Sequence, residues 1–457
     1  MTFSAEPIAL PASLPARSSL RLLLSAVALT LVIRGLAIEL DSDAFVADPD
    51  AYRVIAETIA RSGVFGLTGA DGVPRAIAFR PPLYPWLLSW CMPGGQWSPT
   101  CVTLLHLGLA GFTAAFVFLA TRHLATSLSG GRIRTPERFG LAAAVLTAID
   151  PILLRQSIEV MTETLAATLS AAVIWLWVAW HDDDAPAPAT SSRGIPLGLG
   201  GALALAYLCR PTFLVWAVLL VVATVLRFRN RRGLWSAAVI ASLVAVAVGG
   251  WTWRNARVLG HPVWATTHGG YTLLLANNDS FYRYLSQGRF GRAWDATSFL
   301  KAYAHRHESD PREAAFWRRD WDAAATFDAK VSEVEDDRLC YESAVATIKR
   351  QPSMFAWSAV VRVARLWSPF PHDVSGRSKL AVAAVGLFYL TLFIAVIVAV
   401  ARHRHRMFGS RWWAVWLLAV TLTGVHAVYW SNMRMRAPMM PAIAIIAVFC
   451  VHKKRLG

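Results

Sequence analysis

Residues 380–401 read LAVAAVGLFYLTLFIAVIVAVA, a stretch without a single charged side chain. At 1.5 Å per residue, a helix of this length crosses the hydrocarbon core of a bilayer, which is about 30 Å thick. The rest of the chain fits the same environment, since 55% of its 457 residues are hydrophobic and only 16% are charged. The sequence therefore predicts an integral membrane protein rather than two or three soluble domains.

Similar apolar blocks recur along the chain and predict an all-α bundle of about ten transmembrane helices. The expected spans are 21–38, 100–120, 139–154, 161–180, 195–209, 211–226, 234–252, 380–401, 412–430 and 437–451. The fifth and sixth spans flank Cys209-Arg210-Pro211, which fits either a tight turn or a kink within one helix.

The net charge of +16 would suggest a nucleic-acid partner in a soluble protein, but its distribution follows the topology. With ten spans, the basic clusters fall on the same side of the membrane as the N-terminus. They are Arg122/Arg132/Arg134/Arg138, Arg227/Arg229/Arg231/Arg232, Arg402/Arg404/Arg406/Arg411 and Lys453/Lys454/Arg455. The positive-inside rule makes that side cytoplasmic, so we expect a multi-pass protein of the cytoplasmic membrane and no nucleic acid as a partner.

This topology divides the chain into four parts. A cytoplasmic tail (1–20) precedes a transmembrane module (21–252), and a long outer loop (253–379) precedes the C-terminal helices and a short tail (380–457). The first span is expected to be a retained anchor. The five cysteines lack metal-type spacing and indicate no disulfide framework, and the Asp run 182–184 is typical of a solvated linker.

Two hydrophilic segments are expected on the outer face, and we call them the first loop (39–99) and the long loop (253–379). In the first loop, residues 50–62 carry apolar side chains at helical spacing and end at Gly63, which predicts a surface helix. Residues 79–86, FRPPLYPW, form a rigid, proline-fixed segment. The long loop has no glycine-rich strand-to-helix turn, so we expect no nucleotide-binding domain.

Asp48 and Asp50 lie just beyond the first helix. A carboxylate at the membrane boundary is suited to take a proton from a nucleophile. Either residue could instead cap the helix that follows. The spacing leaves both interpretations open.

Glu163 is a third acidic candidate, at the outer end of an otherwise apolar span. Ionisable groups near membrane depth are costly and usually face a cavity or a partner, which favours a functional role.

Arginines at the outer boundary are candidates for binding the phosphate of a lipid, because a guanidinium binds phosphate bidentately. They are Arg80, Arg210, Arg254, Arg434 and Arg436. The alternative is that each anchors a helix end at the headgroups, and Arg210 beside Pro211 fits that alternative well.

Several of these elements together resemble the GT-C membrane glycosyltransferases, in the bacterial branch of the protein O-mannosyltransferases and lipid A aminoarabinose transferases. The resemblance runs in order along nearly the whole chain. It rests on Asp48 to Tyr52, Arg80-Pro81-Pro82-Leu83-Tyr84-Pro85, Met161-Thr162-Glu163, Arg210-Pro211, Trp253-Arg254-Asn255, Leu275-Ala276-Asn277-Asn278 and Arg434-Met435-Arg436-Ala437-Pro438.

The resemblance implies a GT-C-like helical bundle that transfers a sugar from a polyprenyl-phosphate donor to a lipid, glycan or protein acceptor. It implies that Asp48 is the base, with Asp50 as the alternative, and that Glu163 is the second acidic position. It implies donor-phosphate contacts from Arg80, Arg254, Arg434 and Arg436. Substrate contacts are expected from Tyr52, Tyr84 and Asn277.

We therefore expect an inverting, single-displacement glycosyltransferase that requires no cofactor, with a divalent metal ion left open. Nucleotide sugars are confined to the cytoplasm, so outward-facing acid groups require a lipid-carried donor. The rival functions are a transporter or lipid flippase, whose folds usually show paired broken helices, and a non-catalytic scaffold.

Overall fold

The computed structural model describes residues 17–41, 45, 47–129, 135–182, 194–288, 293–306, 332–372, 374 and 376–452. Outside this part of the chain lie residues 1–16 of the expected N-terminal tail (1–20), the greater part of the Asp run, Arg132, Arg134 and the C-terminal basic cluster; residues 17–20 already belong to a helix.

Helices make up most of the described residues. The helices of the bundle are α1 (Arg17–Leu40), α4 (Pro99–Ser129), α5 (Pro136–Ala148), α6 (Pro151–Ser157), α7 (Glu163–Asp182), α8 (Gly194–Cys209), α9 (Phe213–Phe228), α10 (Arg231–Leu259), α17 (Lys379–Met407), α18 (Trp413–Val428) and α19 (Met440–Ala447). Short 3-10 turns η3 (Ser410–Trp412), η4 (Met433–Met439) and η5 (Val448–Val451) adjoin the last two. A bilayer leaves the backbone no solvent partner, so each span satisfies its own hydrogen bonds as a helix.

Among the described residues, six helices are long and apolar enough to cross a membrane. They are Ser18–Leu40, Pro99–Leu128, Glu163–His181, Arg231–Leu259, Lys379–Met407 and Met433–Val451. Helices α8 and α9 are apolar but shorter. Each of the ten predicted spans coincides with helical structure, which confirms the all-α membrane class.

Two predicted boundaries need correction, and one alternative that the sequence left open is decided. The third span is not one helix: α5 ends at Ala148, and α6 begins at Pro151, where Asp150 accepts a hydrogen bond from the N–H of Leu153 as an N-cap. Helix α10 runs to Leu259 rather than to residue 252, because only Gly260, with φ 73°, ends it. Helices α8 and α9 are separate, with a turn between them at residues 210–212.

The centre of the bundle is formed by α4 and α7. Small side chains on α7, among them Ala166, Ala167 and Ala171, are fully or almost fully buried and let neighbouring backbones approach closely. The hydroxyls of Thr113 and Thr168 join the two helices at 2.8 Å.

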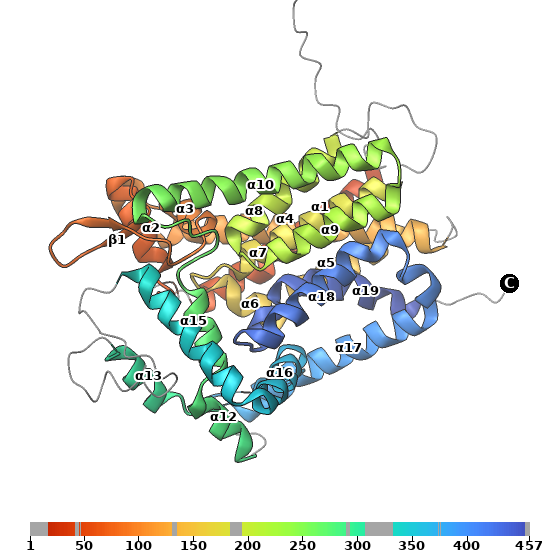
Figure 1. The fold of residues 1–457 in the computed structure, drawn as a ribbon. Helices are drawn as coiled ribbons and strands as arrows, with labels where there is room; N and C mark the ends of the chain where they lie inside the picture. Colours follow the sequence, from red (N-terminus) through yellow and green to blue (C-terminus); the bar gives the residue numbers. More distant parts are fainter. Residues whose placement is uncertain are drawn as a thin grey trace, which may run out of the picture.

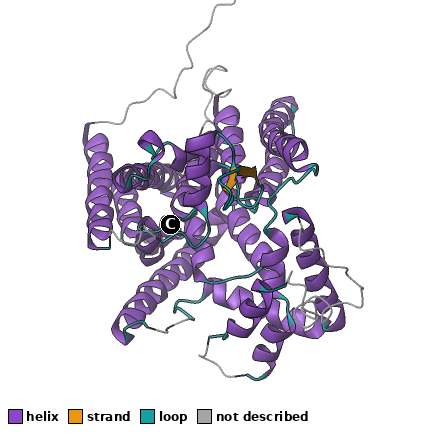
Figure 2. Ribbon diagram, turned by 90° about the vertical axis from the view of Figure 1, so that its left-hand side faces the viewer, coloured by secondary structure: helices purple, strands orange, loops and turns teal. Residues whose placement is uncertain are grey.

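The first loop and the long loop meet at one end of this bundle, on the left of Figure 1. The first loop contains α2 (Tyr52–Ser62), an antiparallel pair of strands β1 (Gly66–Thr68) and β2 (Pro74–Ala76), α3 (Leu83–Ser89) and η2 (Pro93–Gly95). The surface helix that ends at Gly63 is thus confirmed. Figure 2, turned onto this end, shows the short strand pair surrounded by helices.

The described part of the long loop is helical. It contains α11 (Gly269–Ala276), α12 (Asp279–Ser286), α13 (Thr297–Ala304), α15 (Glu333–Arg350) and α16 (Pro352–Trp367). Hydrogen bonds join it to the first loop; for example, Ala78 donates to Glu333 Oε1 at 2.7 Å, and Thr267 donates to the Ala78 carbonyl at 3.0 Å. The two loops predicted to share one face are therefore in contact.

Candidate functional site

Asp48 holds the turn that starts α2. Its Oδ2 accepts a hydrogen bond from the N–H of Val54 at 3.0 Å, so the expected capping role is present. The turn places Ala51 at φ 60°, the one positive φ of a non-glycine residue in the described part of the chain. Oδ1 of Asp48 is buried and has no hydrogen-bond partner among the described residues. One oxygen is therefore used by the fold, and the other is a buried acceptor without a partner, which calls for an explanation.

Asp50 forms an ion pair with Arg80. The Nη2 of Arg80 donates to Asp50 Oδ1 at 2.8 Å, and its Nε donates to the Asp50 carbonyl at 2.8 Å. The guanidinium lies against the rings of Phe79 and Tyr52, 4.5 and 5.5 Å from their centroids. Nη1 of Arg80 makes no hydrogen bond within the described residues, so this nitrogen is free to contact an anion.

Glu163 sits at the start of α7 with its side chain fully buried. Its Oε1 lies 2.8 Å from Arg210 Nη2 and 3.2 Å from Arg434 Nε, and Arg210 Nε donates to the hydroxyl of Thr162 at 2.8 Å. Glu163 therefore gathers two arginines from distant parts of the sequence. Arg210 is part of this cluster and not the interfacial anchor that its proline turn suggested. The side chain of Arg434 is the more exposed of the two, at 32% against 16%.

Tyr52 links the two ion-paired groups. Burial raises the pKa of Tyr52 to about 12, and the charges of Arg80, Asp50, Arg210 and Glu163 also act on its hydroxyl. The Asp50–Arg80 pair and the Glu163–Arg210–Arg434 cluster are therefore close to the same side chain. Because the hydroxyl stays protonated at neutral pH, Tyr52 can act as a hydrogen-bond donor.

Tyr84 is buried behind Tyr52, their ring centroids 5.4 Å apart. Burial raises the pKa of Tyr84 well above its ordinary value. Its hydroxyl is 2.8 Å from His106 Nε2, while His106 Nδ1 faces the carbonyl of Ser157 at 2.8 Å. Since a carbonyl only accepts, Nδ1 carries a proton. In this arrangement Tyr84 packs against Tyr52 and supports it, with its own side chain fully buried.

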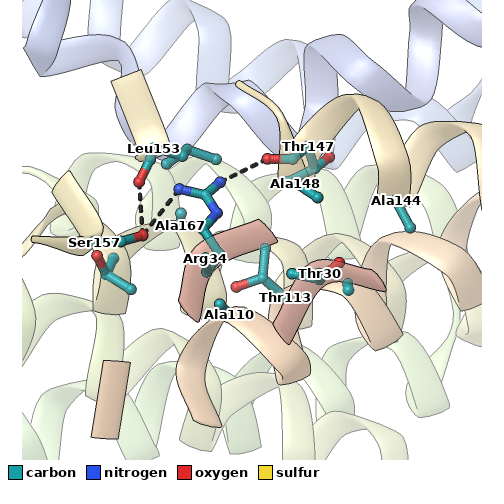
Figure 3. Close-up of a pocket in the computed structure, with 12 residues that line it drawn as sticks. Thr30, Arg34, Ala110, Thr113, Ala144, Thr147, Ala148, Leu153, Ser157 and Ala167 are labelled. Carbon is teal, nitrogen blue, oxygen red and sulfur yellow. Dashed lines mark hydrogen bonds between the residues drawn. The ribbon is translucent and has the colours of Figure 1, made fainter. Parts of the chain in front are cut away.

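Arg34 of α1 continues this buried chain, as Figure 3 shows. Its Nη1 donates to Ser157 Oγ at 2.9 Å and its Nη2 to the Thr147 carbonyl at 2.7 Å. The cavity beside it holds about 20 Å³, room for about one water molecule. The polar chain from Tyr84 to Arg34 ties the first loop to α1, α4 and α6.

Three predicted site residues have structural contacts in this fold. Arg254 donates to the carbonyls of Ile77 at 2.5 Å and Phe65 at 2.6 Å. Arg436 is fully buried and donates to the carbonyls of Leu366 and Ser368, at 2.9 and 2.5 Å. The guanidinium N–H groups of both arginines therefore donate to backbone carbonyl groups rather than lining a cavity.

Asn277 is also fully buried. Its amide donates to the carbonyls of Leu273 and Val428, and its oxygen accepts from Tyr282 and Arg362. It joins α11 to α12, α16 and α18.

A cavity of about 390 Å³ opens where the first loop meets the long loop, and we call it the first cavity. Its walls are Pro49, Asp50, Phe79, Arg80, Thr267, His268, Tyr271, Tyr303, Arg306, Glu333, Asp336, Asp337 and Cys340. The Asp50–Arg80 pair therefore borders a space large enough for a small ligand.

Charged groups of the long loop form the opposite wall of the first cavity. Burial, reinforced by the charges of Asp336 and Glu333, raises the pKa of Asp337 to about 6. Burial also raises the pKa of Glu333, while burial and then the charge of Arg80 lower the pKa of His268 to about 3. Such perturbed groups in a cavity are typical of functional sites.

The sequence did not identify this opposite wall. The helix α15 opens with the acidic stretch Glu333-Val334-Glu335-Asp336-Asp337. Acidic side chains at a helix N-terminus commonly serve only to stabilise the helix. The burial of Asp337 and its hydrogen bond from the N–H of Gly270, at 2.7 Å, arise only from the packing of α15 on α11. Among the described residues, no group of three or more His, Cys, Asp or Glu side chains is arranged to hold a metal ion.

No protein-family model matches the chain, and no curated protein matches it in sequence. Solved structures do match its fold. ArnT from Cupriavidus metallidurans bound to undecaprenyl phosphate is 14% identical, with a TM-score of 0.43, over 95% of this chain and 78% of that one. AglB from Archaeoglobus fulgidus, in complex with an inhibitory peptide and a dolichol-phosphate, is 14% identical, with a TM-score of 0.47, over 95% and 50%.

The oligosaccharyltransferase of Archaeoglobus fulgidus tethered with an acceptor peptide gives a TM-score of 0.50. It is 12% identical over 94% of this chain and 49% of its own length, so this chain spans about half of the archaeal protein. At this identity the likeness concerns the fold. It confirms the all-α membrane architecture that the sequence predicted, in the fold of that oligosaccharyltransferase.

Proposed function

We propose that this chain is a membrane glycosyltransferase that moves a sugar from a polyprenyl-phosphate donor to an acceptor at the outer face of the cytoplasmic membrane. One observation carries the proposal: Asp50, two residues after Asp48, forms its ion pair with Arg80 beside a cavity that the long loop closes, at one end of a membrane bundle. Since one fold can serve many activities, the chemistry is argued from these side chains.

The arginines support a phosphate-bearing lipid as the donor. Arg80 and Arg210 lie near Tyr52, Arg210 and Arg434 pair with Glu163, and Arg80 keeps Nη1 free. A phosphate placed against them would gain charge-assisted hydrogen bonds at the depth of the lipid headgroups. Glu163 is buried, so we assign it to holding Arg210 and Arg434 in place rather than to contacting the sugar.

The proposed reaction is a single displacement. A hydroxyl or amine of the acceptor attacks the anomeric carbon, the bond from that carbon to the phosphate oxygen breaks, and the polyprenyl phosphate leaves with the electron pair. Asp48 Oδ1 takes the proton of the nucleophile. Asp50 is less suited to this task because Arg80 already compensates its charge. The arginines stabilise the negative charge that develops on the departing phosphate.

Two variants test the assignment of the base. Asp48→Asn keeps an oxygen that can cap α2, so the protein should fold normally, but it cannot take a proton. We expect sugar transfer by the purified variant to fall by about 10²- to 10⁴-fold while undecaprenyl phosphate still binds. Asp50→Asn should weaken donor binding instead, because it frees Arg80 from its orientation.

The opposite pattern reassigns the base. Near-normal transfer by Asp48→Asn, together with an inactive Asp50→Asn, would move that role to Asp50. If both variants transfer sugar normally, catalysis by a first-loop carboxylate is wrong. A transporter for the same lipid needs no proton acceptor, so it would move the donor equally well with either substitution.

A further inference from the structure

A second cavity, of about 230 Å³, adjoins the first one in the long loop. Tyr271 borders both cavities, and Trp294, Arg365 and Trp430 are among the other walls of the second. The second cavity therefore lies next to the first, on the other side of Tyr271 from Arg80.

A third cavity, of about 720 Å³, follows the second along α12. Ala293 and Trp294 border both of them. An aromatic side chain thus stands at each junction, Tyr271 at the first and Trp294 at the second. We call this row of three adjoining cavities the trough.

Partly exposed aromatic rings line the trough. The centroids of Tyr271 and Tyr303 are 4.8 Å apart, and those of Trp294 and Trp430 are 5.8 Å apart. None of these four side chains is fully buried, so each can present ring surface to a ligand. Flat apolar surface of this kind suits the C–H faces of sugar rings.

Polar side chains stand beside these rings. Arg283, Gln287 and Asp295 are exposed along the third cavity. Arg365 of the second cavity donates to the hydroxyl of Tyr284 at 3.1 Å. Charges of both signs with an amide between them match neutral hydroxyl groups better than they match a polyanion.

Resting on the proposed function, we propose that the trough binds an extended glycan acceptor, several sugar units long. Its reacting end lies in the first cavity beside Pro49 and Asp50, which follow Asp48 in the chain, and its following units lie against Tyr271 and Trp294. An extended peptide would more commonly add to an unpaired strand edge, and the described residues of the long loop form no strand. Peptide binding is therefore the alternative outcome of the test.

The test measures binding of the full chain, in lipid nanodiscs, to an array of oligosaccharides from one to eight sugar units, with extended peptides beside them. We expect glycan binding that strengthens with length, and Trp294→Ala should weaken binding of the longer glycans by about tenfold, the size of one or two lost aromatic contacts. Trp294→Phe should restore most of it. Trp357→Ala is the matched control, since this half-exposed tryptophan of α16 borders none of the three cavities.

Gln287→Ala provides a second variant, whose folding is not at risk because Gln287 is exposed. This substitution should also weaken the binding of the longer glycans. The inference is overturned by any of three results. No glycan binds, or glycan binding depends neither on the number of sugar units nor on Trp294, or peptides bind more tightly than glycans. Undecaprenyl phosphate binding is measured on the same samples and should be unaffected by Trp294→Ala. Loss of glycan binding with donor binding intact refutes only the extended acceptor, whereas failure to bind the donor refutes the proposed function.

Discussion

At the scale of single residues, Arg80 is the side chain on which donor binding depends most. Its Nε and Nη2 are held by Asp50, so the planar guanidinium is fixed with Nη1 free. A lysine retains the charge but cannot bind Asp50 and a phosphate in the same geometry.

Arg80→Ala should therefore weaken undecaprenyl phosphate binding by about ten- to a hundredfold, the loss of one charge-assisted contact, with Arg80→Lys intermediate. Titration of the purified variants with the lipid measures this. Arg75→Ala is the control, because Arg75 is exposed on β2 and pairs only with Asp71 in the described part. Unchanged donor binding by Arg80→Ala would leave Arg80 with a purely structural role.

Asp337 should make the stability of the protein depend on pH. Its folded-state pKa of about 6 is above the ordinary value of 3.8, so the folded state favours the protonated form. The stability that this preference contributes is complete below about pH 4 and is lost as the pH rises through about 6.

Asp337→Asn removes this titration and can still accept the hydrogen bond from Gly270. It should raise the free energy of unfolding by about 1 kcal/mol at pH 7.5, after allowance for the partial exposure of the side chain. This increase should vanish near pH 4. Thermal unfolding of both proteins across that range checks the expectation. Asp295→Asn is the control: the hydrogen bond from Thr297 lowers the pKa of this exposed carboxyl, so its removal should give no gain. An equal gain at both pH values would contradict the account.

At the scale of elements, Arg254 attaches the first loop to α10. Its two carbonyl contacts lie at Phe65 and Ile77, on either side of the β1–β2 pair. A lysine at this position cannot reach both carbonyls with fixed geometry.

Arg254→Lys should therefore speed amide hydrogen exchange in residues 64–78 and cost about 1.5–3 kcal/mol of local stability. Hydrogen exchange read by mass spectrometry measures it. Arg257→Lys, on the same helix but exposed over the Trp253 ring, should leave the exchange unchanged. If Arg254→Lys instead weakens donor binding with no change in exchange, the phosphate contact expected from the sequence is correct.

The elements were largely predictable, because hydrophobic blocks and a Gly63 helix end are local signals. The break at Asp150-Pro151 carried a local signal too, but an apolar run continued through it. The contacts between the residues of the candidate site were harder to predict from the sequence. Glu163, Arg210 and Arg434 lie far apart in the chain, and nothing in their spacing indicates that one carboxylate binds both arginines.

The arginines of the candidate site illustrate the same limit. The sequence shows Arg80, Arg254 and Arg436 alike as basic residues near helix ends. Only the packed structure shows that Arg80 borders a cavity while Arg436 donates to buried carbonyls at the end of α16. The hydrogen-bond acceptors that each arginine finds depend on tertiary contacts, which a single sequence does not show.

At the scale of the whole molecule, the predicted orientation places the long loop outside the cell. Leu300 of α13 is exposed, and so is Arg232, near the start of α10 at the opposite end of that helix from the long loop. With the five native cysteines replaced, a membrane-impermeant maleimide added to intact cells should label Leu300→Cys and not Arg232→Cys. Labelling of Arg232→Cys alone would reverse the orientation and remove the argument for a lipid-carried donor.

The central claim is that the assembled molecule transfers a sugar from a polyprenyl-phosphate donor. The most direct test incubates the purified chain in proteoliposomes with radiolabelled undecaprenyl-phosphate sugars and glycan acceptors extracted from the cell envelope. We expect label to appear on an acceptor, with one undecaprenyl phosphate released for each sugar transferred and with transfer by Asp48→Asn lower by about 10²- to 10⁴-fold. Donor that crosses the bilayer with its sugar still attached, and with no labelled acceptor, would contradict the account and identify a transporter.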